Sequence, residues 1–80
     1  MKKRAYIVQR KLMTELLRGI RLEAGLTQVE LAKRVGKDQA YISRYESGQR
    51  RLDLLEVREV CQAIGITLED FVRKLEKGLK

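Results

Sequence analysis

Apolar side chains recur every three or four residues along most of this 80-residue chain, which is the spacing of one face of an α-helix. The clearest run is Met13, Leu16, Leu17 and Ile20, at positions i, i+3, i+4 and i+7. The chain contains no proline that would interrupt a helix. The pattern therefore predicts an all-α fold.

Helix-end signals divide this pattern into five helices. Gly25, Gly36, Gly48 and Gly65 each follow an apolar-periodic segment, where a left-handed residue often ends a helix. Capping residues precede four of the segments: Thr27 with Glu30, Asp38, Asp53, and Thr67 with Asp70. We predict helices over residues 9–24, from Thr27 to Gly36, from Asp38 to Gly48, from Asp53 to Gly65 and from Thr67 onward. A basic N-terminal arm over residues 1–8 would precede a single domain over residues 9–80.

The apolar positions of these helices define an expected core. It comprises Leu31, Ala32 and Val35 of the second helix, Ile42 and Tyr45 of the third, Leu55, Val60 and Ile64 of the fourth, and Leu68 and Phe71 of the fifth. A domain of this length has a modest core, so association with a second copy would add stability.

The charge is uneven along the chain. Residues 1–51 hold 13 Lys and Arg against 5 Asp and Glu, whereas residues 52–80 hold 5 against 6, within a total net charge of +7. The basic part is where a polyanion would bind, and the nearly neutral part is free for packing or assembly. The alternative is a surface charge that only keeps the protein in solution.

Composition excludes several function classes. With one cysteine, Cys61, and no histidine, the chain offers no internal disulfide and no credible zinc-ligand set. Cys61 lies on an apolar helical stripe, and we expect it to be a buried core residue. No apolar run reaches the length of a transmembrane helix, about 20 residues, and the N-terminus lacks the core of a signal peptide. We therefore expect a cytoplasmic protein that is not an enzyme and uses no metal, cofactor or membrane.

Residues 28–47 place two short helices around a turn that contains Gly36. Such a pair crosses at a steep angle, so the second helix of the pair projects while the first braces it. A small residue is needed where the two helices approach closely, and Ala32 occupies that position.

The segment LTQVELAKRVGKDQAYISRYESGQRRLDL resembles the helix-turn-helix of the Cro/repressor-type family, also called the xenobiotic-response-element family. The similarity covers about residues 16–72. The positions that fit the family pattern are Gln28, Ala32, Gly36, Ile42, Glu46 and Gly48, and Lys37 departs from it where some relatives bury an apolar residue. The resemblance implies a five-helix, lambda-repressor-like domain that binds double-stranded DNA.

The third helix has an unusual distribution of polar residues. Glu46 lies at the edge of its apolar face, and a half-buried carboxylate needs a cation with several fixed donors. The resemblance implies that Arg21 of the first helix is this partner. The alternative is a solvated Glu46 without a partner.

The outer face of the third helix is small and polar. A recognition helix must approach the major groove closely, so Ala40 and Ser43 suit this face. Gln39 can pair with adenine, and Arg44 with guanine or with a flanking phosphate. We predict that Gln39, Ala40, Ser43 and Arg44 read the bases.

Phosphate contacts are expected at the ends of helices. Gln28, at the first turn of the second helix, can use its side chain and the positive helix end, as the resemblance also implies. Gln49, Arg50 and Arg51 lie in a loop that resembles the family's second backbone clamp, although a solvated loop is the alternative for the two arginines. Tyr41 can either reach a phosphate or pack on the fourth helix.

The fifth helix carries a longer apolar stripe than its packing requires. Val72, Leu75 and Leu79 extend the stripe beyond Leu68 and Phe71, and burial against a second copy would cover them. The alternative is that the stripe folds back onto Leu12 and Leu16 of the first helix.

These features together predict a sequence-specific transcriptional regulator that binds a near-palindromic operator as a homodimer. A phage-type repressor and a restriction-modification controller protein both match it in size. The alternative is an antitoxin that binds a toxin protein as well as its own operator, for which residues 1–15 offer the one candidate segment.

Overall fold

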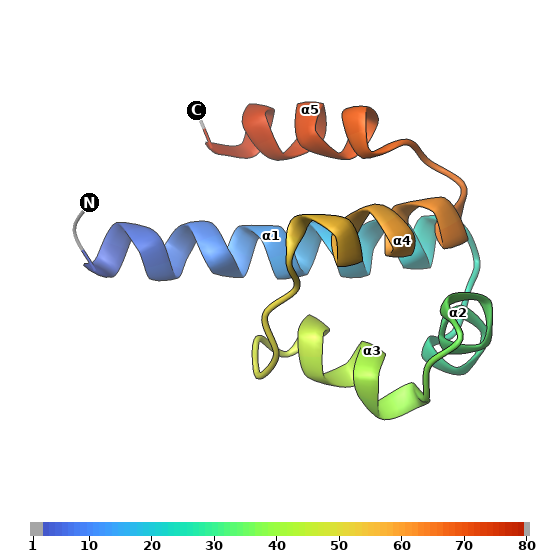
Figure 1. Cartoon of the computed structure of the whole chain (residues 1–80). Coiled ribbons are helices and arrows are strands. Elements are labelled where there is room, and N and C mark those ends of the chain that lie inside the picture. The colour runs from blue at the N-terminus through green and yellow to red at the C-terminus, as the bar shows by residue number, and fades with distance from the viewer. Residues whose placement is uncertain (1–2, 80) are drawn as a thin grey trace.

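The computed structural model describes residues 3–79, which form five helices and no strand. In chain order these are α1 (Lys3–Glu23), α2 (Gln28–Val35), α3 (Gln39–Glu46), α4 (Leu54–Ile64) and α5 (Leu68–Leu79), as Figure 1 shows. The prediction of an all-α, five-helix fold is confirmed, with α2 and α3 as the helix-turn-helix pair.

Four of the helices begin at the predicted caps, and at α5 the Thr67 hydroxyl accepts a hydrogen bond of 3.0 Å from the backbone N–H of Asp70. Thr27 and Glu30 form a complete capping box before α2, as Asp53 and Glu56 do before α4. The carboxylate of Asp38 accepts a hydrogen bond of 3.0 Å from the backbone N–H of Tyr41 and so caps α3. Gly36 and Gly65 follow α2 and α4 with φ of 77° and 108°, a left-handed conformation that side chains other than glycine rarely adopt.

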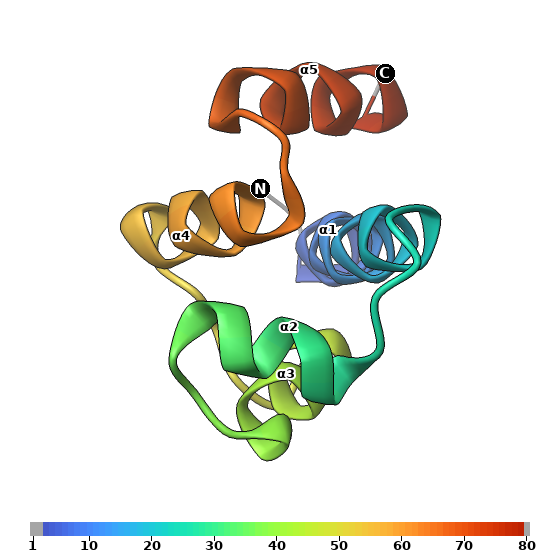
Figure 2. The ribbon, with the colours of Figure 1, turned by 90° about the vertical axis from the view of Figure 1, so that its right-hand side faces the viewer.

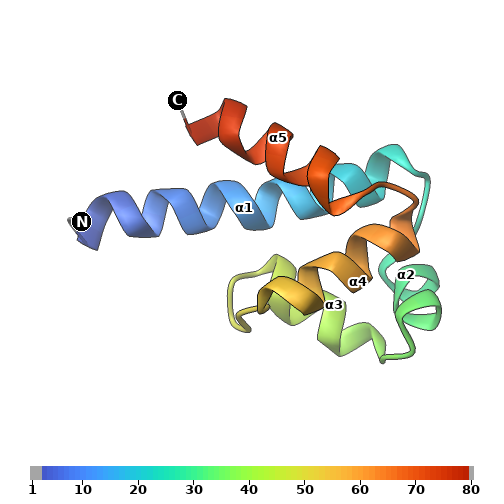
Figure 3. The ribbon, with the colours of Figure 1, turned by 45° about the horizontal axis from the view of Figure 1, so that its top comes forward.

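The first helix begins earlier than the sequence pattern indicated. α1 starts at Lys3 rather than at Gln9, so the part of the expected arm that the structure describes, residues 3–8, is helical. No glycine or proline occurs before Gly19, and nothing in this segment stops a helix that the packed half of α1 has already nucleated. Figure 3 shows the N-terminal half of α1 projecting beyond α2, α3 and α4.

The helices form three tiers, which Figure 2 shows end-on: α5 above, α1 and α4 in the middle, and α2 and α3 below. All five contribute to one core. Its buried members are Leu17, Ile20, Leu26, Leu31, Ala32, Tyr41, Ile42, Tyr45, Val57, Val60, Cys61, Ile64 and Phe71. Burial raises the pKa of the Cys61 thiol to about 11, so this cysteine is protonated at neutral pH.

One expected core residue is misplaced. Leu55 is 70% exposed, whereas Val57 is only 5% exposed and takes the core position expected for Leu55. The reason is the helical period: Val57 lies on the same face as Val60 and Ile64, whereas Leu55 lies on the opposite face. The preceding Leu54 is also 65% exposed, so the first turn of α4 presents two adjacent leucines to solvent.

A buried ion pair joins α1 to α3. The Arg21 Nε donates to Glu46 Oε2 at 2.7 Å, and Nη2 donates to Glu46 Oε1 at 3.0 Å. The Arg21 Nη1 donates to the carbonyl oxygen of Leu26 at 2.8 Å, so the guanidinium also holds the connection between α1 and α2. The two side chains are only 7% and 4% exposed, and the hydrogen bond to Glu46 raises the pKa of Arg21.

We predict that Arg21→Met and Glu46→Gln each lower the free energy of unfolding by about 3 kcal/mol, because each leaves a buried charge without its partner. The double variant should lose clearly less than the sum of the two, since it leaves no unpaired charge. Urea unfolding of the four proteins measures this cycle.

The exposed pair Lys11–Glu15 is the matched control. Its charged atoms lie 3.9 Å apart, and its side chains are 75% and 64% exposed. Glu15→Gln should therefore cause no measurable loss of stability. Strictly additive losses for Arg21 and Glu46 would show that the two side chains do not depend on each other.

Candidate nucleic-acid interface

The outer face of α3 lies on the lower tier, on the side of the molecule away from α5 (Figure 2). Its inner side chains, Tyr41, Ile42 and Tyr45, are buried. The four predicted base-reading residues all lie outside this buried face: Gln39 and Arg44 are exposed, and Ala40 and Ser43 are half-buried. The structure therefore brings them together on one surface of the small, polar character that a major groove requires.

A chain of hydrogen bonds leads from the buried ion pair to this surface. The Gln28 Nε2 donates to Glu46 Oε1 at 3.1 Å, and the Gln39 Nε2 donates to Gln28 Oε1 at 2.6 Å. Gln28 and Gln39 are the first residues of α2 and α3, so the chain joins the beginnings of the two helices. The sequence pattern placed both glutamines at the interface but did not indicate that they bind each other.

This chain fixes the orientation of the Gln39 amide. With one N–H of Nε2 directed at Gln28, the side chain retains its second N–H and both lone pairs of Oε1. These are the groups that a glutamine uses to pair with adenine in the major groove. Gln39 is thus oriented in advance by contacts that originate in the core.

Tyr41 packs on α4, as one of the two interpretations of its position had it. The ring is 8% exposed and lies edge-to-face with Tyr45, with ring centroids 5.8 Å apart. Its hydroxyl donates to Glu56 Oε2 of α4 at 3.4 Å. Burial raises the pKa of Tyr41.

The loop between α3 and α4 is held in place from several sides. The backbone N–H groups of Gln49 and Arg50 donate to the carbonyl oxygen of Arg44 at 2.9 and 3.1 Å. The Arg50 guanidinium forms an ion pair with Glu56 and lies 4.9 Å from the centroid of the Tyr41 ring. Arg50 is therefore held on one side by Glu56 and Tyr41, while its side chain is still 40% exposed.

Arg51 is held by a different helix. Its guanidinium lies 5.7 Å from the centroid of the Tyr6 ring of α1, within the range of a cation–π contact. The sequence pattern did not indicate Tyr6 or Glu56 as supports of this loop. The signal was absent because each contact joins a loop arginine to a residue of a helix through long side chains.

Two carboxylates near the interface are paired with arginines, whereas one arginine of α3 is not paired. Glu46 binds Arg21, and Glu56 binds Arg50. Within the described part of the chain, Arg44 forms no ion pair. The surface therefore presents unpaired positive charge, as binding to a polyanion requires.

Other kinds of site find little support between residues 3 and 79. No three His, Cys, Asp or Glu side chains of these residues lie together in a way that could hold a metal ion. None of the helices they form is long and apolar enough to cross a membrane.

The expected dimer stripe is only partly exposed. Val72 and Leu79 are 40% and 38% exposed, but Leu75 packs against the core. At Gly78, a Cβ would lie 2.9 Å from Leu12 Cδ2, so the end of α5 is in close contact with α1. For Leu75, the alternative in which the stripe folds back onto α1 is therefore the better description. Val72 and Leu79 form a partly exposed edge of α5.

Known proteins share both this sequence pattern and this fold. Residues 17–71 match the helix-turn-helix family. The HTH-type transcriptional regulator y4dJ of Sinorhizobium fredii is 36% identical over 63 residues, which are 79% of this chain and 82% of that protein.

Two solved structures superpose closely. An XRE-family like protein from Pseudomonas syringae pv. tomato has a TM-score of 0.88 at 36% identity, covering 95% of this chain and 93% of that one. The restriction-modification controller protein C.Esp1396I, solved as a tetramer with its natural 35 base-pair operator, has a TM-score of 0.82 at 27% identity, covering 89% and 93%. Because the family match spans more than half of the chain, the protein belongs to the XRE family of helix-turn-helix, DNA-binding transcriptional regulators.

Proposed function

We propose that this protein is a sequence-specific regulator that binds a near-palindromic operator as a homodimer, in the manner of a restriction-modification controller or a phage-type repressor. The bases are read by Gln39, Ala40, Ser43 and Arg44 of α3. Gln28, Gln49, Arg50 and Arg51 contact phosphates on either side of the groove that α3 enters.

One observation carries the proposal. Gln39 is exposed, yet its amide is held at 2.6 Å by Gln28, which in turn is held by the buried Glu46. Fixing the orientation of an exposed glutamine costs side-chain entropy. This cost has no benefit for a glutamine that binds no ligand. A side chain that is oriented before binding reads a base edge at lower cost, which favours sequence-specific contact.

Dimerisation follows from the small size of the surface. One α3 reads only a few base pairs, so a two-fold arrangement is needed for affinity and specificity. The likeness to C.Esp1396I, which was solved as a tetramer on its operator, supports assembly on DNA. In a two-fold dimer the recognition helices would lie about 34 Å apart, one turn of DNA.

The dimer face lies on α5 in this proposal. Val72 borders a hollow of about 410 Å³ together with Leu68, and Leu79 lies further along the same helix. A second copy can bury this edge. Because Leu75 is partly buried and packs against the core, a charge at Leu75 would also destabilise the monomer, so Val72 is the better position for a test.

We predict that Gln39→Ala reduces base preference by about tenfold at one position of each half-site, the loss expected for one bidentate contact. Gln28→Ala should reduce preference at the same position, because it releases Gln39, and should also weaken binding to every sequence. Selection from random duplexes followed by titration of single-base variants measures both.

Gln62→Ala is the matched control, since Gln62 is an exposed glutamine of α4 that belongs to none of these contacts. It should bind all sequences as the wild type does. If Gln28→Ala leaves preference at the Gln39 position unchanged, the hydrogen bond between the two glutamines has no part in reading the base. If selection yields no palindromic consensus, the proposed function is wrong.

We also predict that Val72→Glu gives a folded monomer, with a dimer dissociation constant raised at least about 100-fold because an unpaired charge would be buried at the interface. Operator affinity should fall with it. Sedimentation equilibrium and operator titration measure the two effects.

Leu55→Glu provides the comparison, since Leu55 is a more exposed apolar residue on a different helix. It should remain dimeric and bind normally. The opposite result, a dimeric Val72→Glu and a monomeric Leu55→Glu, would move the interface from α5 to the first turn of α4.

A further inference from the structure

The Tyr41 ring of α3 carries two cations, Lys37 and Arg50, and we call these three residues the Tyr41 cluster. The Lys37 ammonium lies 5.6 Å from the ring centroid, and the Arg50 guanidinium lies 4.9 Å from it. Both distances are within the range of a cation–π contact. Lys37 comes from the turn before α3 and Arg50 from the loop after it, so one ring joins the segments on either side of the recognition helix.

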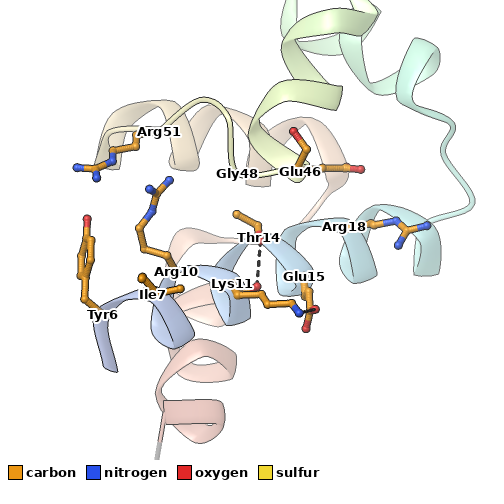
Figure 4. A pocket seen from close by; sticks show the side chains of 11 residues that line it. Tyr6, Ile7, Arg10, Lys11, Thr14, Glu15, Arg18, Glu46, Gly48 and Arg51 are labelled. Atoms are coloured by element: carbon orange, nitrogen blue, oxygen red, sulfur yellow. Dashed lines mark hydrogen bonds and ion pairs between the residues drawn. The ribbon is translucent and has the colours of Figure 1, made fainter. Parts of the chain in front are cut away.

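The other arginine of the loop shows a simpler arrangement. Arg51 lies 5.7 Å from the centroid of the Tyr6 ring, and Figure 4 shows it above that side chain, at the groove between α1 and the loop. Among residues 3–79, Tyr6 contacts no second cation in this way, whereas Tyr41 does. Tyr6 therefore supports one side chain of the proposed interface, and the second cation on Tyr41 requires its own explanation.

Lys37 has a fixed backbone and an uncompensated charge. Its backbone N–H donates to the carbonyl oxygen of Ala32 at 2.9 Å, and the next residue, Asp38, caps α3. Lys37 is exposed, and it forms no ion pair within residues 3–79. Arg50 differs, because Glu56 is its counter-ion. Two cations that share one ring also repel each other, so the one that lacks a carboxylate favours an anion from outside the chain.

The Tyr41 cluster lies on the side of α3 away from Gln28. The Gln39 side chain binds Gln28, and Tyr41 follows Gln39 by two residues, which is about 200° around the helix. Ala40 lies between them on the outer face. A helix about 10–12 Å wide fills a major groove about 12 Å wide, so its two sides face the two backbones. With α3 in the groove, Gln28 and the Tyr41 cluster therefore face different strands.

We propose that Lys37 binds a backbone phosphate of the DNA strand opposite the one that Gln28 contacts. Tyr41 is the positioning residue: its ring holds the Lys37 ammonium beside α3 and keeps Arg50, a proposed phosphate contact, on the same side. Both cationic side chains then need less ordering when DNA binds. This inference rests on the proposed function, and it adds one phosphate contact per protomer.

The first test measures the contribution of the charge. Lys37→Ala should weaken binding to the selected operator and to an unrelated duplex by the same factor, about tenfold for each protomer on the DNA, as expected for one charged hydrogen bond. The salt slope should become shallower by about 0.9 per protomer, and Lys37→Arg should retain it. Lys77→Ala is the matched control, because it removes one positive charge from an exposed lysine of α5, the tier farthest from α3 (Figure 2). It should change neither affinity.

The second test measures the role of the ring with a double-variant cycle. Tyr41→Leu should weaken binding about threefold when Lys37 is present and clearly less when it is combined with Lys37→Ala, because the ring then holds one cation fewer. Tyr6→Leu is the control, and its loss should be the same in both chains. Tyr41→Phe keeps the ring and should bind as the wild type does. If Tyr41→Leu does not fold, NMR tests the contact: the Lys37 ε-methylene protons should be shifted upfield by the ring in the wild type and in Tyr41→Phe.

Each test has a result that would overturn the inference. A Lys37→Ala loss no larger than that of Lys77→Ala would leave Lys37 without a phosphate contact, and a loss confined to one base position would make it a base-reading residue. Equal losses for Tyr41→Leu in the two chains, or unshifted Lys37 ε-methylene protons, would show that the ring does not position Lys37. The proposed function is checked separately: it fails when selection yields no palindromic consensus, whereas the salt slope of Lys37→Ala can be measured on a duplex of any sequence.

Discussion

The orientation of the recognition helix depends on one buried ion pair. Apolar contacts hold α3 against the core but have no direction, so they leave the rotation of the helix about its axis weakly determined. The two hydrogen bonds from Arg21 to Glu46, at 2.7 and 3.0 Å, have a fixed geometry that only one rotation satisfies. A third bond, to the carbonyl oxygen of Leu26, ties the same guanidinium to the chain that leads into α2. The pair contributes more to specifying an arrangement than to net stability.

The side chains of the candidate binding surface are held in place by contacts that begin at this ion pair. Glu46 accepts from Gln28 as well as from Arg21, and Gln28 accepts from Gln39. A side chain on the outside of the molecule is therefore connected to the core through two hydrogen bonds. The loop after α3 is fixed in a comparable way, since Glu56 of α4 holds Arg50 and Tyr6 of α1 lies beneath Arg51. Both parts of the candidate interface are thus held by contacts from other helices.

The sequence indicated the local features well and the long-range ones poorly. Caps such as Thr27 and Asp53 are read from a few neighbouring residues, and the helices that they begin were placed correctly. The partner of Glu46 was identified through a family resemblance, because an ion pair between distant residues leaves no periodic trace. The contacts between Gln28 and Gln39 and between Tyr6 and Arg51 have no local signal at all. The start of α1 was misjudged because residues 1–8 contain no Ser, Thr, Asp or Asn that would mark the beginning of a helix in the sequence.

The N-terminal half of α1 contributes less to the core than α3 does. Tyr6, Ile7 and Val8 are 40%, 56% and 62% exposed, so substitutions in this segment leave the core intact. Gln39 and Arg44 stand on a helix whose other face is buried, and changes there are constrained by Ile42 and Tyr45. Substitutions in the outer segment therefore cost the fold little, whereas substitutions on α3 are limited by the buried side chains on its inner face. In this architecture, the N-terminal half of α1 and the outer face of α3 can be altered separately on one small domain.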